Sequence, residues 1–181
     1  MVIRTDRSPE EEKLVTAFRE VFDASVMNFG SYNLLYAENL LGHAEYPEFA
    51  HRCQEDAAAE LSAQEAAESA RHLIVGYRRE PAELVLCPLD PAEVLPPSEG
   101  QGRPPPSVPV LVNLTNLAGM AAENSTVEIA LSTGRRVKLD VQYRVTFTQV
   151  PEVPLNQQFD VDDFYDFLDH FMDVVERKHA G

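Results

Sequence analysis

The sequence lacks the features that would place it in a membrane, outside the cell or on nucleic acid. No apolar run approaches the roughly 20 residues that a membrane-spanning helix needs. The N-terminal stretch 1–7 lacks the apolar core of a signal peptide, so we expect a cytoplasmic protein. Two cysteines give no disulfide framework. With 15 Lys and Arg against 30 Asp and Glu, the formal charge of −15 repels phosphate backbones and argues against direct nucleic-acid binding.

Signatures of catalysis are also missing from the sequence. It contains no Gly-x-Ser-x-Gly motif, and the glycines at 100 and 102 lie among prolines rather than between a strand and a helix. His43, His51, Cys53 and Glu55 lie close together, but their spacing matches no zinc signature. We therefore expect no enzyme activity, no metal and no cofactor.

The length of 181 residues and a hydrophobic content of 44% suit one globular domain, residues 1–181. The motif Ser-Pro-Glu-Glu at 8–11 marks a helix start, and the apolar residues after it recur at helical spacing, which predicts a helix over 9–29. Residues 55–70, rich in Ala and Glu, predict a second helix that lies against a flat surface.

Strands and a loop follow these helices. The segment 31–37 is short and contains two Tyr, which favours a strand without deciding between strand and helix. Residues 73–77 and 84–87 predict two strands, with Cys87 in the core. Residues 91–106, rich in Pro, Gly and Ser, predict a flexible loop whose loss would leave the core intact.

Residues 108–122 fit two periodicities. A strand-like alternation occupies 110–114, whereas a helical stripe of apolar residues covers a longer window, and this length favours a helix over 108–122. Two apolar residues would lie off its main stripe, and a helix that is apolar on two sides often contacts a second element or another chain. We therefore place a partner or dimer surface on Val112, Asn113, Asn116 and Met120.

Residues 126–149 predict a hairpin whose register follows from parity. Opposed residues share a face of the sheet, and the apolar positions of both strands are odd-numbered. A three-residue loop that ends in a left-handed Gly134 opposes Ile129 to Val137, whereas a two-residue loop would oppose Ile129 to a lysine. The second strand would keep its alternation as far as Phe147.

Residues 161–178 predict the last helix, with Asp160 as its cap and a buried stripe from Phe164 to Val175. The acidic positions between 160 and 173 invite a calcium interpretation, but a calcium loop needs a central Gly and a terminal Glu, and here a helix begins instead. We interpret these carboxylates as helix-start residues and a solvated acidic face. The predicted order is α-β-(α)-β-β-α-β-β-α, an α+β fold in which helices pack on one face of an antiparallel sheet.

The second half of this order, about residues 71–178, resembles the YbjN-like family, whose fold is similar to that of type III secretion chaperones. The resemblance rests on the segment 112–119 with its paired Asn, on the hairpin and on the closing helix. It implies a secretion-chaperone-like fold, a homodimer without catalysis and a surface that binds another protein.

We therefore expect a non-enzymatic, homodimeric, acidic adaptor of chaperone-like type. The negative charge favours a basic protein partner, such as a nucleic-acid-binding protein. An immunity or antitoxin protein that blocks a basic toxin fits the charge equally. A third alternative is a small enzyme or ligand-binding protein that uses Cys53 and His51, since Cys53 precedes a helix start and lies beside Arg52.

Overall fold

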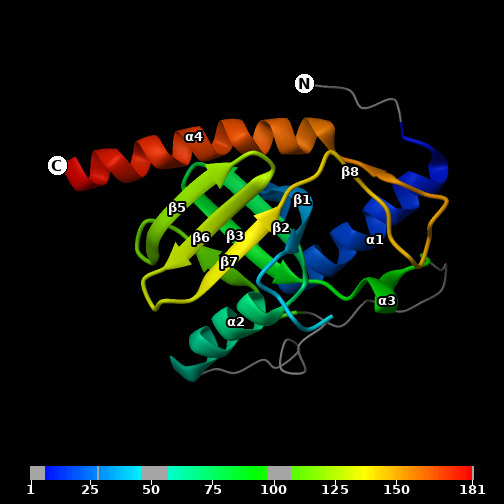
Figure 1. The fold of residues 1–181 in the computed structure, drawn as a ribbon, viewed down its shortest axis with the longest axis horizontal. Helices are drawn as coiled ribbons and strands as arrows, with labels where there is room; N and C mark the ends of the chain where they lie inside the picture. Colours follow the sequence, from blue (N-terminus) through cyan, green and yellow to red (C-terminus); the bar gives the residue numbers. More distant parts are fainter. Residues whose placement is uncertain (1–6, 28, 46–56, 98–106, 181) are drawn as a thin grey trace.

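The computed structural model of the protein describes residues 7–27, 29–45, 57–97 and 107–180 (Figure 1). It begins with helix α1, Pro9–Ser25, where the Ser8 hydroxyl accepts a hydrogen bond from the Glu11 N–H at 3.2 Å, as the sequence predicts. The helix ends at Ser25 rather than at residue 29, because Val26 turns to an extended conformation (φ −121°, ψ 127°) and enters the core.

The other elements confirm the predicted strand near 31–37, the Ala-rich helix and the two strands after it. The chain continues through η1 Phe29–Ser31, β1 Asn33–Asn39, α2 Ala57–Ser69, β2 His72–Arg79, β3 Ala82–Pro88, α3 Pro91–Val94, β4 Val110–Val112, β5 Leu117–Glu123, β6 Thr126–Leu131, β7 Arg136–Asp140, β8 Arg144–Val145, β9 Leu155–Asn156 and α4 Gln158–Ala180.

Seven strands of the described residues form one antiparallel sheet in the order β4-β3-β2-β1-β7-β6-β5. A flat sheet of this size would hold its edges about 29 Å apart, at about 4.8 Å per strand. The edge strands β4 and β5 are nevertheless consecutive in the chain, and residues 113–116 between them reach at most about 19 Å. The sheet must therefore curl, and Figure 1 shows β5–β7 in front of β2 and β3.

An inner core fills the curled sheet. Helix α4 runs along one open side and α2 along the other (Figure 1). The small side chains of Ala63 and Ala67, followed by Ala70 just after the helix, let α2 approach the strands closely, whereas α4 contributes aromatic rings. The residues of this inner core include Leu35, Leu73, Val75, Tyr77, Leu84, Leu86, Val110, Val112, Val127, Ile129, Val137, Leu139, Phe164, Phe167 and Phe171.

An outer core lies on the opposite face of β1–β3, beneath α1. Alternate residues of these strands point there, for example Tyr36, Ile74 and Val85, and they pack against Phe18 and Phe22 of α1. The prediction that helices pack on one face is therefore wrong. Successive residues of β1–β3 point to opposite faces of the sheet, and the residues on both faces are apolar. Each face therefore needs a covering element.

The predicted helix over 108–122 is also wrong, because this segment forms β4, a turn and β5. Val112 pairs with Leu84 of β3, and Met120 pairs with Ile129 of β6. Main-chain pairing with β3 and β6 stabilises the strands more than the helical spacing of apolar residues would stabilise a helix. Tertiary contacts of this kind override local propensity and periodicity. The order of elements accordingly lacks the predicted third helix.

The hairpin register is confirmed. Ile129 pairs with Val137, Glu128 with Lys138, and Gly134 has a φ of +94° at the end of the three-residue loop. The second strand, however, ends at Asp140 instead of continuing to Phe147, whose ring lies in the outer core. Residues 141–157 leave the sheet to connect its two faces.

Two predicted segments need smaller corrections. Within the loop predicted over 91–106, Pro91 and Leu95 are buried, and Leu95 belongs to the outer core, so this part is not a dispensable loop. Asp160 does not cap the last helix, because α4 begins at Gln158 and Asp160 lies within its first turn.

Among the described residues, no helix combines the length and apolar character required to span a bilayer.

Candidate functional site

The residues predicted as a partner surface do not share one exposed face. Val112 is fully buried in the inner core, which removes it from any surface. Met120 is half-buried on β5 and packs against the same core. Asn113 and Asn116 shape the turn between β4 and β5: the Asn113 N–H donates to Asn116 Oδ1 at 2.9 Å, and Asn116 Nδ2 donates to the Leu111 carbonyl at 2.7 Å. These amides hold the bend that closes the curled sheet.

Most of the residues considered for a metal site or a reactive thiol lie outside the residues that the structure describes. His51, Cys53 and Glu55 lie outside the described residues, and His43 is exposed. No group of three His, Cys, Asp or Glu suited to a metal occurs among the described residues. Cys87 lies in the core as predicted, and burial raises the pKa of its thiol to about 12, which keeps it protonated and unreactive.

The carboxylates of α4 divide into paired and solvated groups. Asp163 accepts the Tyr77 hydroxyl at 2.7 Å and pairs with Arg79 at 2.9 Å, and Asp160 faces Arg7 at 3.4 Å. The others are exposed and form no ion pair with any described residue. We name this second group the acidic ridge: Asp162, Asp166, Asp169, Asp173 and Glu176.

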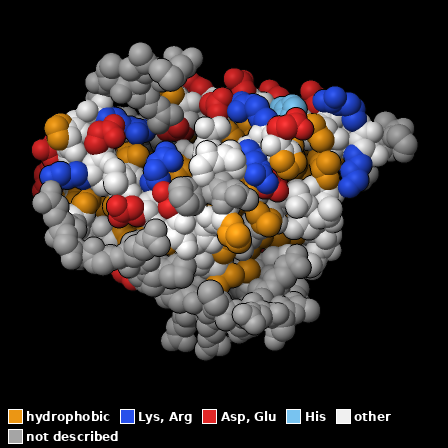
Figure 2. Space-filling view, turned by 180° about the vertical axis from the view of Figure 1, so that it is seen from behind, with side chains coloured by type: hydrophobic (Ala, Val, Ile, Leu, Met, Phe, Trp, Pro, Cys, Tyr) orange, Lys and Arg blue, Asp and Glu red, His pale blue; other side chains and the backbone are white. Residues whose placement is uncertain are grey.

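The acidic ridge is a straight line of charge along α4. Its spacings alternate between four and three residues, so the carboxylates share the helix face opposite the buried Phe164, Phe167 and Phe171. Two half-exposed aromatics border its first member: Tyr143 donates to Asp162 at 2.7 Å, and Phe159 precedes it by one turn, each 50% exposed. Seen from behind, acidic and basic side chains alternate along the upper rim where α4 runs (Figure 2).

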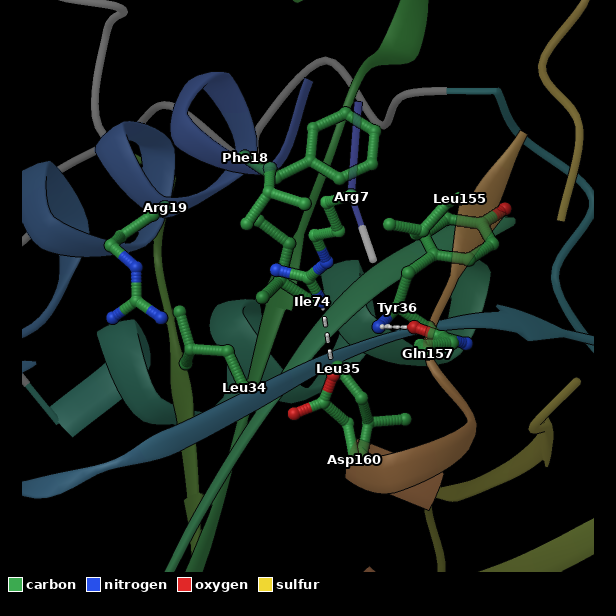
Figure 3. Close-up of a pocket in the computed structure, with 11 residues that line it drawn as sticks. Arg7, Phe18, Arg19, Leu34, Leu35, Tyr36, Ile74, Leu155, Gln157 and Asp160 are labelled. Atoms are coloured by element: carbon green, nitrogen blue, oxygen red, sulfur yellow. Dashed lines mark hydrogen bonds and ion pairs between the residues drawn. The ribbon is translucent and has the colours of Figure 1, made fainter. Parts of the chain in front are cut away.

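A second feature is a groove between α1 and β1, with a cavity volume of about 60 Å³ (Figure 3). Its walls are apolar and come from Val15 and Phe18 of α1, Leu34 and Ile74 of the sheet, and Leu155. The guanidinium groups of Arg7 and Arg19 approach it from two sides, as Figure 3 shows.

The two arginines differ in their surroundings. Arg7 is only 12% exposed and faces Glu11 at 3.8 Å and Asp160 at 3.4 Å, so it joins the first turns of α1 and α4. Glu11 also accepts the Asn156 N–H at 2.7 Å. Arg19 is exposed and has no hydrogen bond or ion pair with the residues the structure describes. It is therefore the cation of this groove that can meet a ligand.

A hydrogen-bonded chain of Tyr36, His72 and Glu45 lies at the far side of β1. The Tyr36 hydroxyl is 2.7 Å from His72 Nδ1, and His72 Nε2 is 2.8 Å from Glu45 Oε2. Burial raises the pKa of Tyr36, and the bond from His72 lowers the pKa of Glu45. The Tyr36 ring is buried between Phe18 and Phe147, so these hydrogen bonds anchor Glu45, which follows β1, to the outer core.

The sequence interpretation missed Arg7, Arg19 and Gln157. Arg7 stands four residues before Glu11, a spacing that places opposite charges together around a helix start and could have been noticed. Nothing in the local sequence connects Arg7 to Asp160, which is 153 residues away.

Comparison with protein families, with curated proteins and with solved structures finds no match to this chain.

Proposed function

We propose that this protein is a non-enzymatic adaptor that binds a basic protein partner through the acidic ridge. The observation that carries the proposal is the line of five exposed carboxylates on one face of α4, none of them paired with a cation among the described residues. Like charges three and four residues apart destabilise a helix slightly, so they are better explained by a partner that neutralises them.

The border of the ridge supports a protein as the partner. Tyr143 and Phe159 expose aromatic surface beside Asp162, and buried aromatic anchors contribute much of the binding energy in protein interfaces. A partner helix with Lys or Arg at matching intervals would pair with the carboxylates while an apolar residue covers the aromatics. The formal charge of −15 would speed this encounter at low salt.

Homodimerisation and the likeness to secretion chaperones form a second part of this proposal. Met120 is the residue of the predicted dimer surface that is both apolar and accessible. Light scattering tests the point: a dimer that Met120→Asp converts to a monomer would support it, and a monomeric wild type at micromolar concentration would contradict it.

Binding of a labelled helical peptide, with Lys at three- and four-residue spacing and one Leu near its end, tests the ridge. The variant Asp166→Lys/Asp169→Lys/Asp173→Lys should bind about tenfold more weakly or worse, since each exposed pair contributes about 0.2–1 kcal/mol. The matched control Glu10→Lys/Glu12→Lys/Glu20→Lys makes the same charge change on exposed positions of α1. Equal losses in both variants would overturn the proposal, because net charge alone would then explain binding.

A further inference from the structure

Strand β1 has an open edge although it lies in the middle of the sheet. It pairs with β2 from Asn33 to Glu38, but with β7 only at Glu38 and Asn39. Strand β7 ends at Asp140, and the chain then leaves the sheet. The first part of β1 therefore has no neighbouring strand on its β7 side within the described residues.

Two main-chain hydrogen bonds establish which groups of β1 face this open edge. The Asn39 N–H donates to Arg71 toward β2, whereas the Leu40 N–H donates to Lys138 toward β7, both at 2.8 Å. The direction alternates along a strand, so the even-numbered residues of β1 face the β7 side. Tyr36 and Leu34 are therefore the residues whose N–H and C=O groups point to the open edge.

The side chain of Gln157 acts as a substitute strand partner for Tyr36. Its Oε1 accepts the Tyr36 N–H at 2.9 Å, and its Nε2 donates to the Tyr36 carbonyl at 2.8 Å. Leu34, the next position along the edge, has no such partner in the part of the chain that the structure describes. Leu34 is half-buried, so its main-chain N–H and C=O are available to pair with an added strand.

The unpartnered position opens into the groove beside α1. Leu34 lines the groove together with Val15, Phe18 and Ile74, and Figure 3 shows Arg19 reaching from α1 toward Leu34. The volume of about 60 Å³ is well below the roughly 150 Å³ that accommodates benzene, so the groove takes no more than one aliphatic side chain. The free main-chain edge at Leu34, the apolar cavity and the Arg19 guanidinium, which has no ion pair among the described residues, therefore lie together at this groove.

We infer that this groove binds an extended peptide segment of a partner protein. The segment would pair with Leu34 as an added strand, insert one Val, Ile or Leu side chain into the cavity, and place on Arg19 the carboxylate of an Asp or Glu two residues along, because alternate side chains of a strand share a face. Added strands gain affinity from main-chain hydrogen bonds and specificity from the pockets for alternate side chains. No ridge residue lines the groove, so this inference does not depend on the proposed function.

A labelled hexapeptide Thr-Thr-Leu-Thr-Asp-Thr, titrated into the full chain, tests the inference. The Leu34 amide should become protected from hydrogen exchange when the peptide binds. Replacing the peptide Leu by Ala or its Asp by Asn should weaken binding about tenfold in each case. Isovalerate, a free branched carboxylate, should bind far more weakly because it offers no backbone to pair with Leu34.

Two protein variants separate the parts of the site. Arg19→Gln should weaken peptide binding about tenfold, whereas Lys13→Gln, which removes one exposed cation from the same helix, should not. Val15→Phe should block the cavity, and its circular dichroism and thermal unfolding would show that the fold persists.

Four results would overturn the inference. They are isovalerate binding as tightly as the peptide, equal effects of Arg19→Gln and Lys13→Gln, an unprotected Leu34 amide in the peptide complex, and concentration-dependent protection of Leu34 without peptide, which would assign the edge to a second copy.

Discussion

Asp160 and Asp163 at the start of α4 belong to the same helix as the acidic ridge but have a different role. Asp160 and Asp163 hold the helix to α1 and β2 through Arg7, Arg79 and Tyr77. The carboxylates of the acidic ridge contact solvent, and among the described residues they form only one side-chain hydrogen bond, from Tyr143 to Asp162. The face of α4 on which a carboxylate lies, and the neighbours that it meets there, therefore decide whether it stabilises the fold.

Removing the cation between the two helix starts should produce the largest effect. Arg7→Met leaves Glu11 and Asp160, whose side chains are 5% and 11% exposed, without the guanidinium that faces both. We expect a loss of about 2–4 kcal/mol in the free energy of unfolding, measured by urea denaturation, because a buried charge without its partner is costly. Arg7→Lys keeps the charge and should lose less. A loss below about 0.5 kcal/mol, the range of ordinary surface substitutions, would show that the cluster is solvated.

Shortening the second paired carboxylate should have an intermediate effect. Asp163→Ala deprives the buried Tyr77 hydroxyl of its closer acceptor and Arg79 of its pair, and we expect a loss of about 1–3 kcal/mol in thermal or urea unfolding. The ion pair itself contributes little of this, since both of its side chains are more than one-third exposed. Asp163→Asn, which retains an acceptor for Tyr77, should recover most of the stability. Equal losses in the two variants would instead assign the effect to Arg79.

Alkaline pH should reveal another buried carboxylate cluster. Tyr32 donates to Glu83 and lies 4.7 Å below the Arg78 guanidinium. Burial, followed by the bond to Glu83, raises the pKa of Tyr32 from 10.0 to about 12. The folded protein therefore holds this proton more tightly, so the stabilisation is complete below pH 10 and is lost as the pH rises toward 12. Ultraviolet titration of wild type and Tyr32→Phe should show one late-ionising phenol missing in the variant, and a normal Tyr32 titration near pH 10 would contradict the cluster.

Neutralising the ridge should give the smallest effect, with the opposite sign. Asp166→Asn/Asp169→Asn/Asp173→Asn removes repulsion between like charges three and four residues apart, and we expect a gain of about 0.2–0.5 kcal/mol in unfolding free energy at low salt. The gain should vanish in 1 M NaCl, where the Debye length falls to about 3 Å. A destabilised variant would mean that the ridge has intramolecular partners after all.

The hairpin at 126–140 was predictable because its geometry is local. Strand alternation fixes which residues share a face, and one glycine fixes the loop, so the pairing of Ile129 with Val137 follows from a short stretch of sequence. The first helix start was predictable for the same reason, since Ser8 and Glu11 are three residues apart.

The segment 110–123 was not predictable, because distant strands decide its conformation. Val112 pairs with Leu84 on β3 and Met120 pairs with Ile129 on β6, and no local sequence pattern predicts these pairings. The groove escaped prediction for a related reason: the Gln157 side chain bonds the main chain of Tyr36 across 121 residues. Long-range contacts of this kind need the fold before they can be recognised.

The place of α4 in the chain has a consequence for biosynthesis. Every strand of the sheet leaves the ribosome before this helix does, and the aromatic rings that complete the inner core arrive with it. A nascent chain that has made all seven strands still exposes apolar surface on the inside of its sheet until Phe171 has left the ribosome. Premature termination within this last helix would therefore release a chain whose inner apolar surface stays exposed and which is prone to aggregate.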